Sequence, residues 1–230
     1  MKLSKTIQFQ DDTTIGMGLK GQNANSDESQ IWSDFLAGSD SALSFIYRKY
    51  TPMLFNYGRQ FCEEETAYDC IQDLFFYIIK KREKLRPTTA IKPYLFASLR
   101  RMIKRKSDRL RKEVKDDTLV LTGNFKISIE AWANTESSLE KEQLTNVLVK
   151  ACDQLPERQR EAVLLRYFEQ FSFEEIGEIM DIGKIKSVRA LIYRGIESLR
   201  ELLLKMKDQI AFYALLYITK NLNPLSQQVV

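Results

Sequence analysis

The fold is decided by one stretch, residues 155–200, which reads LPERQREAVLLRYFEQFSFEEIGEIMDIGKIKSVRALIYRGIESLR. Pro156 near its beginning is typical of the first turn of a helix, because proline lacks the N–H that goes unpaired there. Ser172 and Glu175 have the S-x-x-E spacing of a capping box, which predicts that a second helix starts at this point. Apolar residues at helical spacing after Ser187 predict a third helix. The stretch therefore predicts three short consecutive helices.

The last two of these helices are separated by residues 181–184, where Gly183 is the predicted left-handed turn residue. A short helix, a glycine turn and a second helix with a basic exposed face are typical of a helix-turn-helix that reads the DNA major groove. An ordinary helical hairpin with a solvated charged face fits the same pattern. In the helix-turn-helix interpretation, Arg189 is the first candidate for contact with a base edge. The candidate DNA-contacting residues on this helix are Lys184, Lys186, Ser187, Arg189, Ala190, Tyr193 and Arg194.

Positive charge is concentrated in one part of the chain. Residues 80–115 contain 15 Lys and Arg against three acids, a local charge of +12 in a chain whose total is +4. The remaining residues therefore sum to −8. A concentration of this kind indicates a polyanion-binding face on an otherwise acidic body.

The composition argues against several classes of function. The 230 residues include no histidine, which removes the commonest general base and the commonest transition-metal ligand. Cys62, Cys70 and Cys152 are odd in number and far apart, so they favour a reducing compartment over a disulfide framework or a zinc site. The first ten residues lack the apolar run of a secretory signal, and the most apolar run, 210–218, is too short for a membrane span. We therefore expect a cytoplasmic protein that is not an enzyme and has no metal or cofactor.

Helical periodicity without strand alternation predicts an all-α protein. The periodicity fails between residues 111 and 137, and a structureless segment of that length is uncommon inside a domain. In the first half, Thr51 and Pro52 predict a break before a helix that starts near Leu54. We expect two small helical domains joined by a flexible linker, the second containing the helix-turn-helix. The predicted segments are a mobile leader at 1–26, a first domain at 27–110, the linker at 111–137, a second domain at 138–204 and an apolar helical tail at 205–230.

Both halves of the chain resemble one family. Residues 155–200 resemble the fourth conserved region of bacterial extracytoplasmic-function (ECF) RNA polymerase sigma factors, and three stretches resemble its second region: SALSFIYRKYTPMLFNYGRQFC (41–62), DCIQDLFFYIIKKREKL (69–85) and IKPYLFASLRRMIKRK (91–106). The resemblance implies binding to core RNA polymerase and to promoter DNA, as duplex and as melted strand, with no small-molecule substrate. It also suggests an anti-sigma partner, which no residue of the chain demonstrates independently.

The resemblance assigns three contacts to particular residues. Asp69, Gln72 and Asp73 match the element that docks on the polymerase, whereas Phe75 in that element is expected in the core. Residues 86–106 match the segment that opens and holds the promoter element nearest the start site. The candidates there are Arg86, Lys92, Tyr94, Arg100, Arg101, Lys104 and Arg105, of which Arg100, Arg101 and Lys104 are expected to face solvent. The helix-turn-helix would read the more distant element, and one extra residue around 183–185, relative to the family pattern, leaves the start of its second helix open.

Two other functions fit parts of the sequence. A helix-turn-helix regulator that acts without polymerase would explain residues 155–200, but it gives no reason for the Gln72–Asp73 element or for the basic helix. A metal-dependent nuclease would find carboxylates at 63–65 and 116–117, but adjacent side chains diverge on a helix and a flexible linker cannot preorganise ligands. For the tail, the sequence allows a helix packed on the second domain or a self-inhibitory cover.

Overall fold

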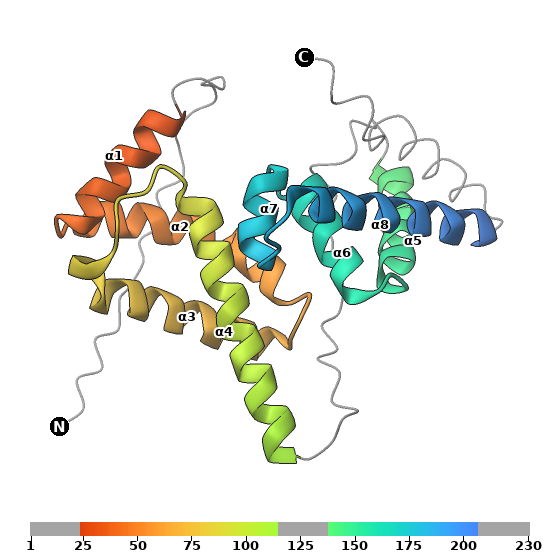
Figure 1. Cartoon of the computed structure of the whole chain (residues 1–230), viewed down its shortest axis with the longest axis horizontal. Coiled ribbons are helices and arrows are strands. Elements are labelled where there is room, and N and C mark those ends of the chain that lie inside the picture. Colours follow the sequence, from red (N-terminus) through yellow and green to blue (C-terminus); the bar gives the residue numbers. More distant parts are fainter. Residues whose placement is uncertain (1–23, 115–137, 207–230) are drawn as a thin grey trace.

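The computed structural model describes residues 24–114 and 138–206, and all of the regular structure within them is helical (Figure 1). The first half contains α1 (Ala24–Leu36), α2 (Asp40–Gly58), α3 (Glu64–Lys80), a short 3₁₀ turn η1 (Arg82–Lys84) and α4 (Ile91–Val114). The second half contains α5 (Ser138–Asp153), α6 (Glu157–Val163), a π-helical turn η3 (Leu164–Phe168), α7 (Phe173–Met180) and α8 (Ile185–Met206). The predicted all-α class is confirmed for these residues.

The segment limits predicted from the sequence lie close to helix ends. Helix α1 begins at Ala24, inside the predicted leader, and α4 continues to Val114, inside the predicted linker. The remainder of the leader, of the linker and of the tail, including its apolar run at 210–218, lies outside the described residues. None of the described helices is long and apolar enough to cross a bilayer.

Helix α2 is continuous, so the predicted break at Thr51 and Pro52 was wrong. Proline inside a helix removes one backbone hydrogen bond and crowds the preceding turn, which makes a break the usual expectation. Here Pro52 is exposed, whereas Tyr50 and Leu54 on either side of it are buried in the core. Burial of the flanking side chains holds the helix together across the proline.

Helices α3 and α4 bury the apolar stripes that their sequences predict. On α3, Ile71, Leu74 and Phe75 are buried, and on α4 Leu95 and Leu99 are fully enclosed. Side chains three and four positions apart share one face of a helix, so this burial directs the charged residues of both helices outward.

The helix-turn-helix is formed by α7 and α8. Its capping box is confirmed: the Glu175 N–H donates to Ser172 Oγ at 3.1 Å, and the Ser172 N–H donates to the Glu175 carboxylate at 2.7 Å. The prediction of a left-handed Gly183 was wrong, because Asp181 ends α7 in that conformation with φ of 57°. Aspartate tolerates it because its short polar side chain can hydrogen-bond locally. Helix α8 then begins at Ile185, which answers the open question of its start.

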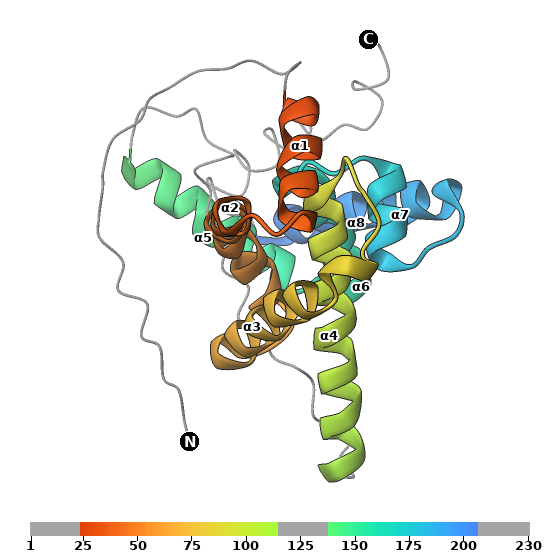
Figure 2. The same cartoon turned by 90° about the vertical axis from the view of Figure 1, so that its left-hand side faces the viewer.

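The two halves pack against each other along α4 and α7 (Figures 1 and 2). Buried apolar side chains of both halves form one continuous cluster. Within it, Phe96 of α4 and Phe171, just before α7, meet edge-on with their ring centroids 5.0 Å apart. One face of the basic helix α4 is therefore covered by the second half of the chain.

Candidate nucleic-acid and polymerase interfaces

Helix α8 presents most of the predicted duplex-binding residues to solvent. Lys184, immediately before the helix, accepts hydrogen bonds through its backbone carbonyl from the N–H groups of Ser187 and Val188, at 2.9 and 3.3 Å. Val188 is buried and so fixes which side of the helix faces outward. The side chains of Lys184, Lys186, Ser187, Ala190 and Arg194 are exposed, and those of Arg189 and Tyr193 are half-buried.

Arg189 is held against an aromatic ring. Its guanidinium carbon lies 4.9 Å from the ring centroid of Phe173, and that of Arg166 lies 4.6 Å from the same centroid. Arg166 also donates to the carbonyl oxygen of Phe171 at 2.9 Å. Because the capping box places Phe173 at the first position of α7, its ring is fixed beside the first turns of α8. Sequence reasoning missed Phe173 and Arg166, since the contact joins side chains of three separate segments.

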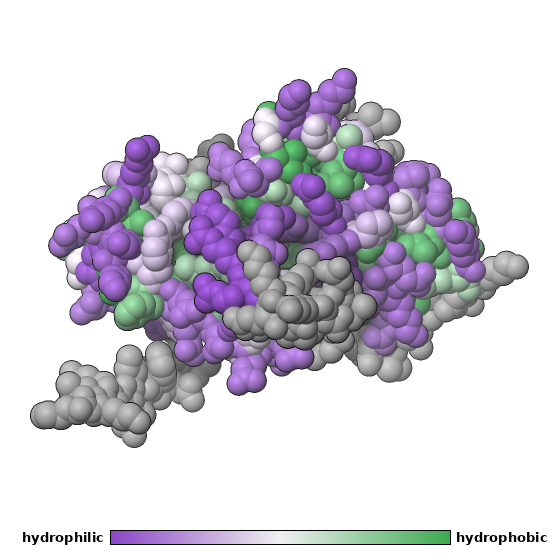
Figure 3. All heavy atoms as spheres, turned by 60° about the horizontal axis from the view of Figure 1, so that its bottom comes forward, coloured by the Kyte–Doolittle hydropathy of each residue, from purple (hydrophilic) through white to green (hydrophobic). Residues whose placement is uncertain are grey.

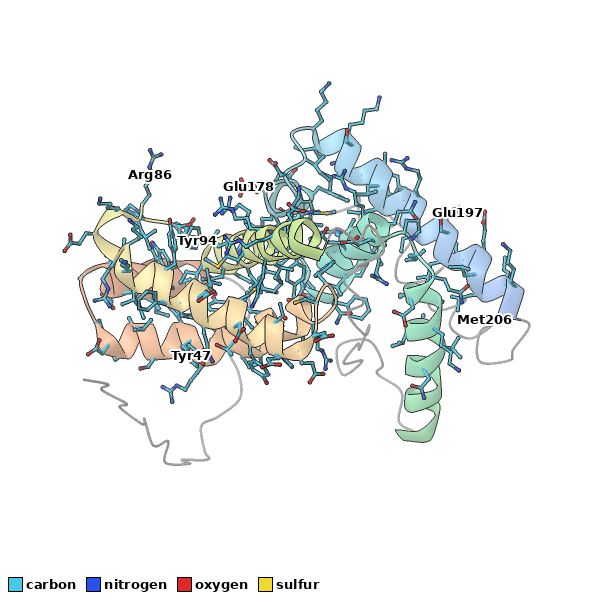
Figure 4. The ribbon with its side chains drawn as sticks, turned by 90° about the horizontal axis from the view of Figure 1, so that it is seen from below. Tyr47, Arg86, Tyr94, Glu178, Glu197 and Met206 are labelled. Atoms are coloured by element: carbon cyan, nitrogen blue, oxygen red, sulfur yellow. The ribbon has the colours of Figure 1, made fainter. Side chains whose placement is uncertain are left out.

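The exposed part of the predicted melted-strand face lies along α4 and in the loop before it. Arg101 and Lys104 are exposed on α4, as predicted, and so is Arg105. Arg86 projects away from the body of the protein (Figure 4), while its backbone carbonyl oxygen accepts a hydrogen bond from Trp32 Nε1 at 3.1 Å. These four side chains place positive charge where a nucleic-acid strand can reach it.

Tyr94 is less accessible than these basic side chains. It is half-buried, with its ring 5.4 Å from Trp32 in an edge-on arrangement. Burial raises the pKa of its hydroxyl, and the neighbouring Tyr77 adds to the effect. The phenol therefore stays neutral at ordinary pH and offers a ring and a hydrogen bond but no charge.

Lys92 and Arg100 form ion pairs with acidic residues of the second half. Arg100 was expected to face solvent, but its Nε and Nη2 lie 2.6 and 3.1 Å from the two carboxylate oxygens of Glu161. Lys92 Nζ lies 2.9 Å from the Glu169 carboxylate and donates to the carbonyl oxygen of the same residue at 2.7 Å. The physical reason is the packing of the second half on α4, which local periodicity does not report.

The predicted polymerase face is the outer side of α3. Asp69, Gln72 and Asp73 are all exposed, and Asp69 forms an ion pair of 3.0 Å with Lys106. Phe76 is 67% exposed and lies three and four positions beyond Asp73 and Gln72, on the same face of the helix. Sequence reasoning missed Phe76, although its spacing from the acidic and amide residues was available as a signal.

Figure 3, which tilts the bottom of the molecule toward the viewer, shows a mostly hydrophilic surface with separate hydrophobic patches on the described residues. Within the described residues, no three His, Cys, Asp or Glu side chains gather closely enough to hold a metal ion.

Burial raises the pKa of both Cys62 and Cys152 to about 12, so these thiols stay protonated at neutral pH. Their contribution is to packing.

In comparisons with known proteins, each half of the chain matches a protein-family model. Residues 46–115 match the family model for sigma-70 region 2, and residues 145–199 match that for sigma-70, region 4. RNA polymerase sigma factor CarQ of Myxococcus xanthus is 28% identical over 181 residues, covering 77% of this chain and 98% of CarQ. ECF RNA polymerase sigma factor SigW of Bacillus subtilis is 34% identical over 66 residues, covering 29% of this chain and 35% of SigW.

Two solved structures share the fold. CnrH, in complex with the cytosolic domain of CnrY, superposes with a TM-score of 0.54 at 18% identity, over 79% of this chain and 99% of the other. The sigma factor RpoE, in complex with the anti-sigma factor NepR from Bartonella quintana, superposes with a TM-score of 0.51 at 24% identity. The match covers 70% of this chain and 96% of the RpoE chain. With region 2 followed by region 4 along one chain, this protein belongs to the sigma-70 family and, within it, to the ECF group of RNA polymerase sigma factors.

Proposed function

We propose that this sigma factor initiates transcription through three separate faces, one each for core polymerase, duplex promoter DNA and melted strand. The observation that carries the proposal is the order of the two sigma regions on one chain. Each region also has exposed charged residues within the stretch that resembles the family. Promoter opening needs all three, because the factor has to stay on the polymerase while it holds two forms of DNA.

The polymerase face consists of Asp69, Gln72, Asp73 and Phe76 on α3. Polar side chains around an exposed aromatic ring are the usual composition of a binding hot spot and its rim. Because these side chains point away from the core, no packing role competes with a role in binding.

The two DNA faces differ in what they recognise. Helix α8 carries Arg189, which can donate to two acceptors of guanine in the major groove, while Lys184 and Lys186 neutralise phosphates. Helix α4 and residues 86–91 carry dense positive charge with Tyr94 nearby, a combination suited to single-stranded DNA. Duplex is therefore read by region 4 and the melted strand is held by region 2.

The proposed role is binding alone, so the chemistry of RNA synthesis belongs to the polymerase and the factor is not itself an enzyme. We place it in the cytoplasm, where bacterial transcription takes place. The similarity to RpoE, solved with the anti-sigma factor NepR, supports an anti-sigma partner for this chain as well.

Run-off transcription with purified core polymerase tests the proposal. Core polymerase with this chain should give transcripts from a promoter that core polymerase alone does not use. The double variant Gln72→Ala, Asp73→Ala should lose both transcription and co-purification with core polymerase while it keeps duplex binding. A factor that binds promoter DNA but is never retained by polymerase would instead be a helix-turn-helix regulator, and the proposal would be wrong.

A further inference from the structure

Two carboxylates of the second half form ion pairs with basic residues of the predicted melted-strand face. Glu161 lies in α6 and Glu169 directly follows η3, whereas their partners Arg100 and Lys92 both lie on α4. All four groups are thus brought together by the packing of the two halves. An anion that binds to Lys92 and Arg100 therefore has to displace Glu169 and Glu161 from them.

The Arg100–Glu161 pair has the geometry that arginine uses for a phosphate. Two guanidinium nitrogens face two carboxylate oxygens in a fork, which is the arrangement found for both carboxylate and phosphate partners. Tyr57 of α2 completes the site by donating its hydroxyl to the same carboxylate at 2.7 Å. Glu161 is only 4% exposed, so its charge is stable in that place only while both partners remain.

Lys92 is enclosed in a comparable way. Besides the carboxylate and carbonyl oxygens of Glu169, its ammonium lies over two rings, 4.7 Å from the centroid of Phe171 and 5.6 Å from that of Phe96. These two rings also contact each other across the boundary between the halves. Separating the halves would break the two ion pairs and the aromatic contact together.

We propose that the second half of this chain competes with DNA for α4, with Glu161 and Glu169 standing in for strand phosphates. In the closed arrangement, Lys92 and Arg100 are occupied and α7 covers one face of α4. The factor has to open before these residues can hold a melted strand. The inference rests on the proposed function, in which α4 binds that strand.

The test measures strand binding by the free, full-length chain without polymerase. The double variant Glu161→Gln, Glu169→Gln keeps the side-chain size but removes both negative charges. The matched control is Glu174→Gln, Glu178→Gln, which removes two exposed charges from the neighbouring α7. The control is needed because any loss of negative charge strengthens DNA binding in general. The probe is a fluorescent single-stranded oligonucleotide of arbitrary sequence, and small-angle scattering reports the radius of gyration.

The double variant should bind the oligonucleotide roughly tenfold more tightly than the control does, because apparent affinity scales with the fraction of open molecules. Its radius of gyration should increase, with the helical circular dichroism unchanged. Equal affinities of variant and control, or an unchanged radius, would overturn the proposal. If the double variant does not fold, Glu169→Gln alone gives the same test at the less buried of the two pairs.

A further variant separates this proposal from the function on which it rests. Arg101→Gln, Lys104→Gln removes two exposed cations of α4 that form no ion pair with the described residues of the second half, unlike Lys92 and Arg100. If this variant keeps full affinity for the oligonucleotide, the strand-binding role of α4 is wrong. If it loses affinity while Glu161→Gln, Glu169→Gln gains none, only the competition is wrong.

Discussion

Arg189 illustrates how a single side chain depends on another helix. Its guanidinium lies against Phe173, so fewer rotamers are open to it than to a freely solvated arginine. A planar cation over a ring is stabilised by about 0.5–2 kcal/mol, depending on its exposure to water. A base-reading arginine that is already oriented loses less entropy when it meets DNA.

Phe173→Leu should therefore weaken sequence-specific duplex binding by roughly 1 kcal/mol, because the apolar contact remains but the ring is lost. Phe173→Tyr should preserve binding. The measurement compares affinity for the cognate distant element with affinity for random duplex, in the presence and absence of Arg189→Ala. An equal loss in the Arg189→Ala background would mean that Phe173 acts on stability and not on the arginine.

At this scale the sequence predicted which side chains are candidates, but only part of what they touch. Arg189 and the capping residues Ser172 and Glu175 were identified from local spacing, because caps and helix faces depend on residues a few positions apart. The pairing of Arg100 with Glu161 joins residues 61 positions apart, and no local pattern carries that information.

Among the elements, α6 and α8 approach closely at a glycine. A Cβ added at Gly195 would lie 2.8 Å from Val163 Cγ2 and 3.3 Å from the carbonyl oxygen of Gln159. From the sequence alone, Gly195 only weakens a helix, and alanine would be expected to strengthen it by about 1 kcal/mol. The packing reverses that expectation, because Val163 is buried and its branched side chain is stiff.

Gly195→Ala should lower the free energy of unfolding by about 1 kcal/mol, since overpacking costs about 1–3 kcal/mol and exceeds the gain in helix propensity. Denaturant unfolding of the full chain measures it. Adding Val163→Ala to Gly195→Ala should remove the clash, so the double variant should fall short of the sum of the two single losses. A simple increase in stability on Gly195→Ala would contradict the packing argument.

Helix α3 carries a second prediction, for its outer face. Phe76→Ser should weaken binding to core polymerase by about 2 kcal/mol if the ring is a hot spot, with little change in stability because the side chain is mostly exposed. Leu204→Ser is the control, since Leu204 is 61% exposed but lies at the far end of α8. Equal effects of both substitutions on polymerase binding would exclude a specific role for Phe76.

Helix boundaries show where local signals suffice. The capping box placed the start of α7 correctly, because side chain and backbone meet within three residues. Local signals did not suffice at two other positions: the helix break predicted at Pro52 and the left-handed conformation predicted for Gly183 were both wrong. In the first case tertiary burial of Tyr50 and Leu54 prevails over a local rule, and in the second Asp181 takes a conformation that glycine usually takes.

For the whole molecule, charge asymmetry predicted which helix carries the excess of positive charge, but not that part of this charge is paired within the protein. The local charge of +12 over residues 80–115 marks α4 as the basic element. Composition does not report that two acids from the other half neutralise part of it, because Glu161 and Glu169 resemble any solvated glutamate in the sequence. Only the packing of the two halves buries them.

The salt dependence of strand binding reports how many of these cations are free. Each phosphate that a protein neutralises on a single strand contributes about −0.7 to the slope of log affinity against log salt concentration. Opening the molecule frees Lys92 and Arg100 together, so the Glu161→Gln, Glu169→Gln variant should show a slope about 1.4 steeper than that of the unaltered chain. Substituting both cations by glutamine in that variant should restore the shallower slope, whereas Glu174→Gln, Glu178→Gln should leave it unchanged, because removing an exposed acid creates no new phosphate contact. Identical slopes in the open variant and the unaltered chain would mean that the two cations never reach the strand, and the closed arrangement would then serve stability alone.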